Sequence, residues 1–225
     1  MTDPGQQPTP ELPEVRRFAH VMTRLRAECP WDAEQTHRSL VPYLIEEACE
    51  VVDAIEDGDP ADLREELGDL LLQVFFHATI AAETDTFDLD DVAAGIADKL
   101  IRRHPWVFAA DDTPDDLMGS WEERKRAEKA RTSALDGIAH RMSAMARATK
   151  VVSRARAHRV EVPLATEPVT ADDFGREVLD LVARAQHSGV DPEQALRDAL
   201  RGLESRVRAA EGEGPDAARR GAALG

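Results

Sequence analysis

The residues that could do chemistry in this chain are carboxylates repeated at a three-residue spacing on both sides of a Gly-Asp-Pro break at residues 58–60. Glu47 and Glu50 precede the break, and Glu66 and Asp69 follow it. This spacing places both members of a pair on one side of a helix, and two helices joined by so short a break must run antiparallel. Glu50 lies eight residues before the break and Glu66 six residues after it, so at about 1.5 Å per residue they reach nearly the same level. We therefore expect four carboxylates to meet across one helical hairpin.

A site of this composition is suited to a hard divalent cation. The facing rows of the predicted hairpin carry four carboxylates and no cysteine or histidine, which favours Mg²⁺, with Mn²⁺ as a substitute, over zinc. Clustered acids also repel one another unless a divalent ion neutralises them, so the pattern indicates a metal site rather than a pair that shares a proton.

Asp69 is the most informative of the four carboxylates. It is the only charged residue in LGDLLLQVFF, residues 67–76, where apolar positions cover the whole circumference and predict a helix buried on all sides. A buried lone carboxylate costs several kcal/mol unless it is paired, protonated or bound to a metal. The position of Asp69 therefore strengthens the metal interpretation.

A basic cluster closes the helix predicted between Asp88 and Pro105. Its members fall within about one turn: Lys99, Arg102, Arg103 and His104. Favourable interaction with a helix C-terminus accounts for one or two of these cations, less readily for all. Further along, Trp121 and Lys125 are four residues apart and could present a ring and an ammonium group to one ligand. A metal with Lys99, Arg103 and Lys125 nearby suits a polyphosphate ester, the anion that needs both.

The connector CPWDAEQTHRSL, residues 29–40, contains Trp31 and ends near a possible helix cap. A single tryptophan in such a loop usually fills the edge of a core, and otherwise forms a wall on which a ligand stacks. Ser39 is predicted to cap the next helix, since Pro42 is tolerated in a first turn.

Composition predicts an all-α protein. Aromatic residues make up only 4% of the 225 residues, and β-branched runs are scarce. A formal net charge of −16 argues against nucleic acid or an anionic membrane as a general partner. The two cysteines show no metal spacing or disulfide framework, and no stretch is apolar enough to span a membrane, so a cytoplasmic location is expected.

The C-terminal third resembles a weakened second copy of the carboxylate region. LREELGDLL at residues 63–71 has an echo in FGREVLDLV at residues 174–182, where Glu177 and Asp180 keep the three-residue spacing. The position that corresponds to Glu47 is His158, and two prolines interrupt the place of the first carboxylate helix. We therefore do not expect this copy to bind metal.

The strings CPWDAEQT, IEEACE, EELGD, KLIRRHPWVF and WEERK, in this order, resemble the MazG nucleoside triphosphate pyrophosphohydrolases of the all-α pyrophosphatase superfamily. The resemblance is strong from residue 14 to about 135. It implies a MazG-like catalytic domain (14–135) followed by a degenerate second helical region (136–211). Four prolines and little hydrophobic periodicity predict a disordered leader (1–13), and a disordered tail (212–225) is also expected.

The family motif, EExxE followed by ExxD, falls on Glu46, Glu47, Glu50, Glu66 and Asp69. The resemblance implies that the last four bind Mg²⁺, that Lys99, Arg103, Trp121 and Lys125 contact the nucleotide, and that the protein forms a homodimer. It also implies cleavage of NTPs and dNTPs to the monophosphate and pyrophosphate, in housecleaning of the nucleotide pool. Glu46, one residue off the ligand face, is our candidate for orienting or deprotonating the attacking water.

Three alternatives remain open from the sequence. A ferritin-like di-iron bundle also uses helix carboxylates but requires Glu-x-x-His, whereas the residue three after Glu66 is Asp69 and His77 lies eleven away. A helical dimerisation module without catalytic activity leaves the charge of Asp69 unexplained. A pyrimidine-selective enzyme that acts on dUTP or dCTP is possible because base choice depends on pocket shape.

Overall fold

The computed structural model describes residues 11–109, 112–117, 121, 124, 128 and 132–213. The regular elements among them are all helices, which confirms the predicted all-α fold. The chain forms two compact units, Met1–Phe108 and Ala109–Gly225. The boundaries predicted at residues 13, 135 and 211 stay predictions, although the last residue of the predicted leader, Pro13, already begins a helix.

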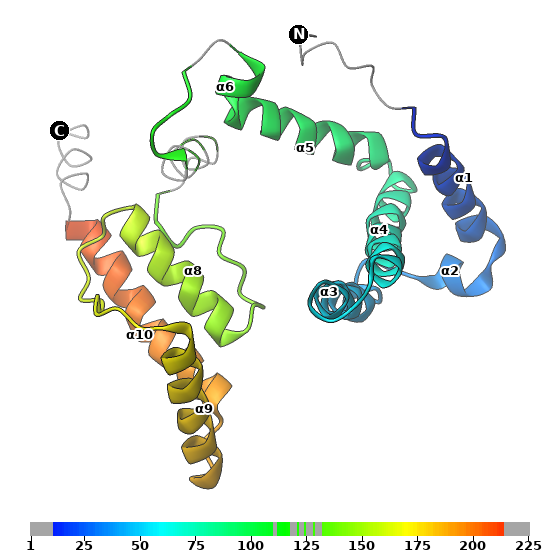
Figure 1. Cartoon of the computed structure of the whole chain (residues 1–225). Helices are drawn as coiled ribbons and strands as arrows, with labels where there is room; N and C mark the ends of the chain where they lie inside the picture. The colour runs from blue at the N-terminus through cyan, green and yellow to red at the C-terminus, as the bar shows by residue number, and fades with distance from the viewer. Residues whose placement is uncertain are drawn as a thin grey trace. The chain divides into compact units, whose positions relative to one another are not determined.

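The first unit contains six helices among its described residues (Figure 1). They are α1 (Pro13–Glu28), α2 (Pro30–Glu34), α3 (Val41–Glu56), α4 (Pro60–Ala82), α5 (Leu89–Arg103) and α6 (Pro105–Phe108). α3 and α4 lie side by side as an antiparallel hairpin, α1 packs on α4, and α5 leads from the end of α4 to α6.

Local sequence explains the tight turn between α3 and α4. The side chain of Asp59 accepts hydrogen bonds from the backbone N–H groups of Ala61 and Asp62, and the Asp62 carboxylate accepts one from the Asp59 N–H. This reciprocal capping box, with Pro60 in the first turn, begins α4 at the break predicted at residues 58–60. A Cβ on Gly58 would lie 2.8 Å from the backbone of Ala54, so only glycine allows the chain to leave α3 so closely.

The prediction that Ser39 caps α3 is wrong. The residue before the first helical position is Leu40, and it makes no side-chain cap. The Ser39 hydroxyl instead donates to the side chain of Gln35 and accepts from the backbone N–H of Thr36. These short-range bonds shape the connector between α2 and α3, and Leu40 is turned into the core.

The core of the first unit forms where α1, α4 and this connector meet. Met22, Leu40, Phe75 and Phe76 are buried together. The segment 67–76 is not buried on all sides in the single chain: Leu67 is 49% exposed, and Leu71 and Val74 are each 40% exposed. The prediction of a helix covered around its whole circumference is therefore wrong for one copy of the chain, because α1, α3 and the connector leave part of the α4 surface uncovered.

The second unit is built on α8 (Ala144–Ala157), α9 (Ala171–His187) and α10 (Pro192–Glu213), with α10 packed along α8 (Figure 1). Its core includes Ile138, Val151, Leu200 and Val207. Arg147 is buried in this core, where it pairs with Glu204 at 2.7 Å and donates a 2.8 Å hydrogen bond to the Ala139 carbonyl. Charged side chains are thus part of the packing of this unit.

Candidate metal and nucleotide site

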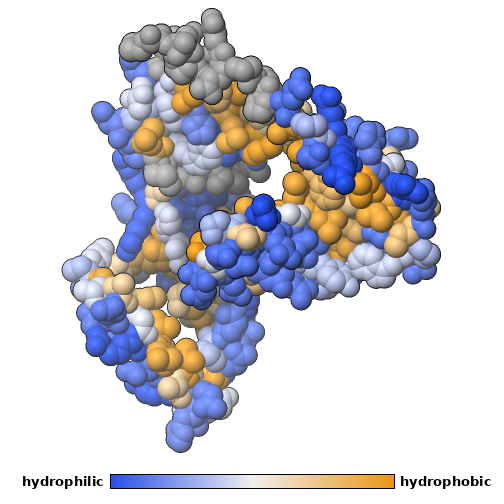
Figure 2. Space-filling model, turned by 45° about the vertical axis from the view of Figure 1, so that its right-hand side comes forward, coloured by the Kyte–Doolittle hydropathy of each residue, from blue (hydrophilic) through white to orange (hydrophobic). Residues whose placement is uncertain are grey.

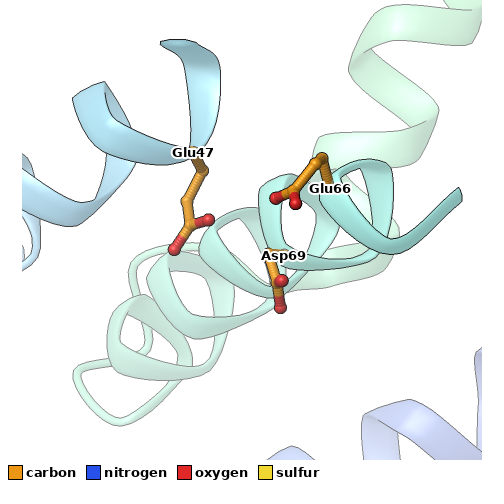
Figure 3. Close-up of side chains that lie close together, drawn as sticks. All are labelled: Glu47, Glu66 and Asp69. Atoms are coloured by element: carbon orange, nitrogen blue, oxygen red, sulfur yellow. The ribbon is translucent and has the colours of Figure 1, made fainter. Parts of the chain in front are cut away.

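Three carboxylates meet between α3 and α4. Glu47 comes from α3, and Glu66 and Asp69 come from α4; each offers an oxygen within 4.8 Å of the other two. Figure 3 shows Glu47 reaching from its helix toward the helix that carries Glu66 and Asp69. All three side chains are half-buried. The three-residue spacing on α4 and the antiparallel packing against α3 bring them together, as the sequence suggests.

The fourth predicted ligand, Glu50, lies beside this cluster rather than within it. Glu50 is exposed on α3, yet its negative charge acts on both Glu47 and Glu66, and it shares a hydrogen bond with the Glu47 carboxyl group. Glu46 is also exposed and adds negative charge near Glu47. Glu50 is thus near the other acids, and its role as a metal ligand stays a prediction.

Among the described residues, the charges that act on Glu47 and Glu66 are those of neighbouring acids. Burial, followed by the charges of Asp69 and Glu50, raises the pKa of Glu47. Loss of hydration, followed by the charges of Glu50 and Asp69, raises the pKa of Glu66. Within the part of the chain that the structure describes, the charges behind both shifts belong to carboxylates. Such a group of oxygen donors fits a divalent cation that neutralises them and prefers oxygen ligands.

The donor set also bears on the di-iron alternative. The cluster contains carboxylates only, among the described residues, and His77 is hydrogen-bonded to His37 instead of facing it. A bundle that holds two iron ions through Glu-x-x-His has no counterpart in this arrangement.

The predicted cations on α5 lie far along that helix from its contact with the core. Leu89, at the start of α5, packs against the core residues of α1 and α4. Lys99 and Arg103 follow ten and fourteen residues later, which is about 15 to 20 Å along the helix axis. Lys99 is half-buried, Arg102 is exposed and Arg103 is buried. Their contact with a nucleotide stays a prediction.

The remaining predicted nucleotide contacts fall elsewhere. Trp121 is a half-buried residue of the second unit, and Lys125 lies outside the described residues. The contact of both residues with a nucleotide stays a prediction.

Trp31 lies at the edge of the core and is accessible from outside. Its ring meets Phe76 and Tyr43 edge to face, with centroid separations of 6.3 and 5.9 Å, while the residue is 51% exposed. Tyr43 is four residues before Glu47 on α3, and Phe76 is seven residues after Asp69 on α4, so these positions share the faces that carry the carboxylates. The sequence analysis missed Tyr43, although its helical spacing from Glu47 was visible.

Comparison with known proteins agrees with this geometry. The family model of the MazG nucleotide pyrophosphohydrolase domain matches residues 35–108. The chain is 41% identical over 186 residues to the nucleoside triphosphate pyrophosphohydrolase of Escherichia coli, an alignment that covers 79% of this chain and 70% of that protein. The chain belongs to the MazG family. The segment that matches the MazG model contains α3, α4 and α5, and with them the three clustered carboxylates.

Two other relatives show how far the similarity extends. The chain is 44% identical over 209 residues to an uncharacterized 26.1 kDa protein of Streptomyces cacaoi, covering 90% of this chain and 85% of that protein. It is 37% identical over 203 residues to the nucleoside triphosphate pyrophosphohydrolase/pyrophosphatase MazG of Thermotoga maritima, covering 80% and 79% of the two chains. The similarity to MazG proteins therefore continues into the second unit. Among the described helices, none is long and apolar enough to cross a membrane.

Proposed function

We propose that this protein hydrolyses nucleoside and deoxynucleoside triphosphates to the monophosphate and pyrophosphate, with Mg²⁺ held at the α3–α4 hairpin. The observation that carries the proposal is the convergence of Glu47, Glu66 and Asp69 within 4.8 Å, with raised pKa values for two of them, in a chain of the MazG family. Names of its relatives describe the same reaction class.

Glu47, Glu66 and Asp69 would hold the metal, with Glu50 as the fourth ligand from the adjacent turn of α3. When bound, Mg²⁺ would polarise the bridging phosphates and lower the barrier to attack by water at the α-phosphorus, and Mn²⁺ would substitute for it. Glu46 is exposed and directly precedes Glu47, so we propose that it orients or deprotonates the attacking water.

The nucleotide would extend from this metal site to two kinds of side chain. We propose that Lys99, Arg102, Arg103 and Lys125 neutralise the phosphate chain and that Trp121 contacts the nucleotide. Trp31 is proposed as a stacking surface, and its ring contacts with Tyr43 and Phe76, which lie one and two helical turns from Glu47 and Asp69, support this role. Tyr43, 40% exposed beside it, would form part of the same surface.

We further propose that the active form is a homodimer. Large apolar side chains of the hairpin are exposed to solvent in the single chain: Ile45, Val52, Ile55, Leu67, Leu71 and Val74. Figure 2 shows apolar patches on the face of the molecule in view. Burial of the exposed side chains of the hairpin would stabilise association by roughly 25 cal/mol per Å² of apolar surface, so a second copy that covers them is favoured.

The biological setting is also a proposal. Cys29 and Cys49 are both free thiols, which supports a reducing, cytoplasmic location. A housecleaning role would follow if the enzyme accepts non-canonical nucleotides that a cell must remove.

Product analysis tests the proposed reaction. The purified protein is incubated with ATP and Mg²⁺, and pyrophosphate and orthophosphate are measured separately, with EDTA-treated protein as the control. We expect AMP and pyrophosphate in equal amounts and loss of activity with EDTA. Release of orthophosphate would overturn the scheme. A panel of canonical, oxidised and deaminated triphosphates, including dUTP and dCTP, would then determine base preference.

A further inference from the structure

A histidine pair outside the carboxylate cluster joins the connector before α3 to α4, at the end of the hairpin opposite the Gly58 turn. His37 lies in the connector that precedes α3, and His77 lies on α4, eight residues after Asp69. Their Nδ1 atoms are 2.8 Å apart, which is hydrogen-bonding distance. The Gly58 turn joins α3 and α4 at one end of the hairpin, and this pair joins the start of α3 to α4 at the opposite end.

The ring geometry shows what kind of contact this is. The two ring planes are within 10° of parallel, but the ring centres are 5.1 Å apart, much farther than the two nitrogens. Both Nδ1 atoms therefore lie between the ring centres and point at each other, so the contact is a nitrogen-to-nitrogen hydrogen bond and not a face-to-face stack. One Nδ1 must carry the hydrogen and the other must be bare.

We propose that His37 and His77 form a proton-sharing clamp that positions the start of α3 against α4. The clamp opens when the pair has bound two protons more than it carries when both rings are neutral. With no extra proton, the two rings adopt opposite tautomers and keep one N–H···N bond. With one, an imidazolium Nδ1–H donates to the bare Nδ1 of its neighbour, and the bond is charge-assisted. With two, both Nδ1 atoms carry hydrogens, so the bond is lost and two positive charges face each other.

The surroundings of the pair agree with this behaviour. Burial and the facing charge of His37 lower the pKa of His77. The residues one turn away from His77 on α4 do not ionise: Gln73, Val74, Ile80 and Ala81. From the other elements, the ionisable residues nearest to His37 along the chain are Arg38 in the connector, Glu34 on α2, Glu28 on α1, and Tyr43 and Glu46 on α3. His37 is the charged group that lowers the pKa of His77.

The clamp bears on the proposed metal site because Glu47 follows on the helix that it positions. Leu40, between His37 and α3, is fully buried, so the connector transmits the position of His37 to the first turn of α3. Opening the clamp would let α3 move relative to Glu66 and Asp69. This consequence rests on the proposed function, whereas the clamp itself does not.

His37→Asn separates the hydrogen bond from its titration. The asparagine amide occupies the position of Nδ1 and can donate to a neutral His77 or accept from a protonated one. We expect the variant to match the wild type in melting temperature at pH 7.5 and to lose less between pH 6.5 and pH 5, because a lowered His77 pKa means that the wild type loses stability as pH falls below the unfolded pKa. His20→Asn, which changes an exposed histidine on α1, is the matched control and should follow the wild type at every pH.

Two further measurements complete the test. His37→Phe, which cannot hydrogen-bond, should melt below the wild type at pH 7.5 and approach it at pH 5. Mg²⁺ affinity is measured by calorimetry at pH 7.5 and pH 5. The loss of affinity on acidification should be up to about fivefold larger in the wild type than in His37→Asn, which corresponds to one net hydrogen bond. Parallel pH profiles for wild type and His37→Asn would overturn the clamp. If neither the wild type nor the variants release pyrophosphate, while their melting temperatures change with pH as expected, only the proposed function would be overturned.

Discussion

The two units carry the same Glu-x-x-Asp spacing and use it differently. On α4, Glu66 and Asp69 face Glu47 of the neighbouring α3. On α9, Glu177 and Asp180 are exposed, and the shallow depression beside them is lined by α9 alone, with Arg184 one turn after Asp180. The spacing places two carboxylates on one side of a helix in both units, but only the first unit supplies a facing carboxylate. A second helix, and not the motif alone, makes the cluster.

The buried charges of the second unit lie elsewhere and are paired. Arg147 on α8 binds Glu204 on α10 with both side chains about 10% exposed. Arg154, also on α8, donates a 3.1 Å hydrogen bond to the Ala134 carbonyl. In the first unit, like charges are held together without a counterion among the described residues. We interpret the ion pair of the second unit as structural. We interpret the acidic cluster of the first unit as a site that a cation completes.

The largest expected effect separates the two motifs by activity. Asp69→Asn should reduce Mg²⁺-dependent pyrophosphate release by about a thousandfold or more, because a metal ligand supports several kcal/mol of transition-state stabilisation. The matched variant in the echo, Asp180→Asn, should keep the wild-type rate. Steady-state rates measured with circular dichroism as a folding control test both. Equal losses in the two variants would remove the distinction between the motifs.

The next effect concerns stability in the second unit. Glu204→Gln leaves the buried guanidinium of Arg147 without its charge partner, and we expect a loss of about 3 kcal/mol in the free energy of unfolding. Glu193→Gln, which alters a more exposed ion pair with Arg197, is the control and should cost less than about 1 kcal/mol. Urea denaturation measures both. A result below 1 kcal/mol for Glu204→Gln would contradict the structural role.

The smallest expected effect is a gain in stability instead of a loss. It concerns Glu66 in the first unit of the metal-free protein. Because the folded-state pKa of Glu66 is raised, its contribution to stability is present below the unfolded pKa and lost as pH rises through the folded value. Glu66→Gln should therefore raise the melting temperature of the metal-free protein at pH 7.5, and this gain should vanish near pH 4.5.

Mg²⁺ sharpens the same experiment. The ion should raise the melting temperature of the wild type more than that of Glu66→Gln, since the variant lacks one ligand. Glu56→Gln, an exposed acid near the end of α3, should behave like the wild type with and without metal. A Glu66→Gln protein that melts below the wild type in EDTA would show that this carboxylate is not under electrostatic strain.

Prediction from sequence succeeded where the deciding interactions are local. The start of α4 depends on Asp59, Pro60 and Asp62, which lie within four residues, and the sequence therefore predicted a break between the helices at residues 58–60. The pairing of Glu66 with Asp69 on one face follows from helical periodicity alone. The Ser39 cap failed, because the hydroxyl had competing partners in its own connector that a helix-start rule does not weigh.

The sequence by itself determined the all-helical fold, the hairpin and the residue types of the acidic cluster, because periodicity, capping and glycine geometry act over a few neighbouring residues. Only the tertiary structure decided that Glu50 lies beside the cluster, that Trp31 meets Tyr43 and Phe76, and that His37 meets His77 across 40 residues. It also decided that Leu67, Leu71 and Val74 remain exposed. These outcomes depend on which helix covers which face. An apolar pattern predicts that a helix face is buried, but it does not identify the element that covers it.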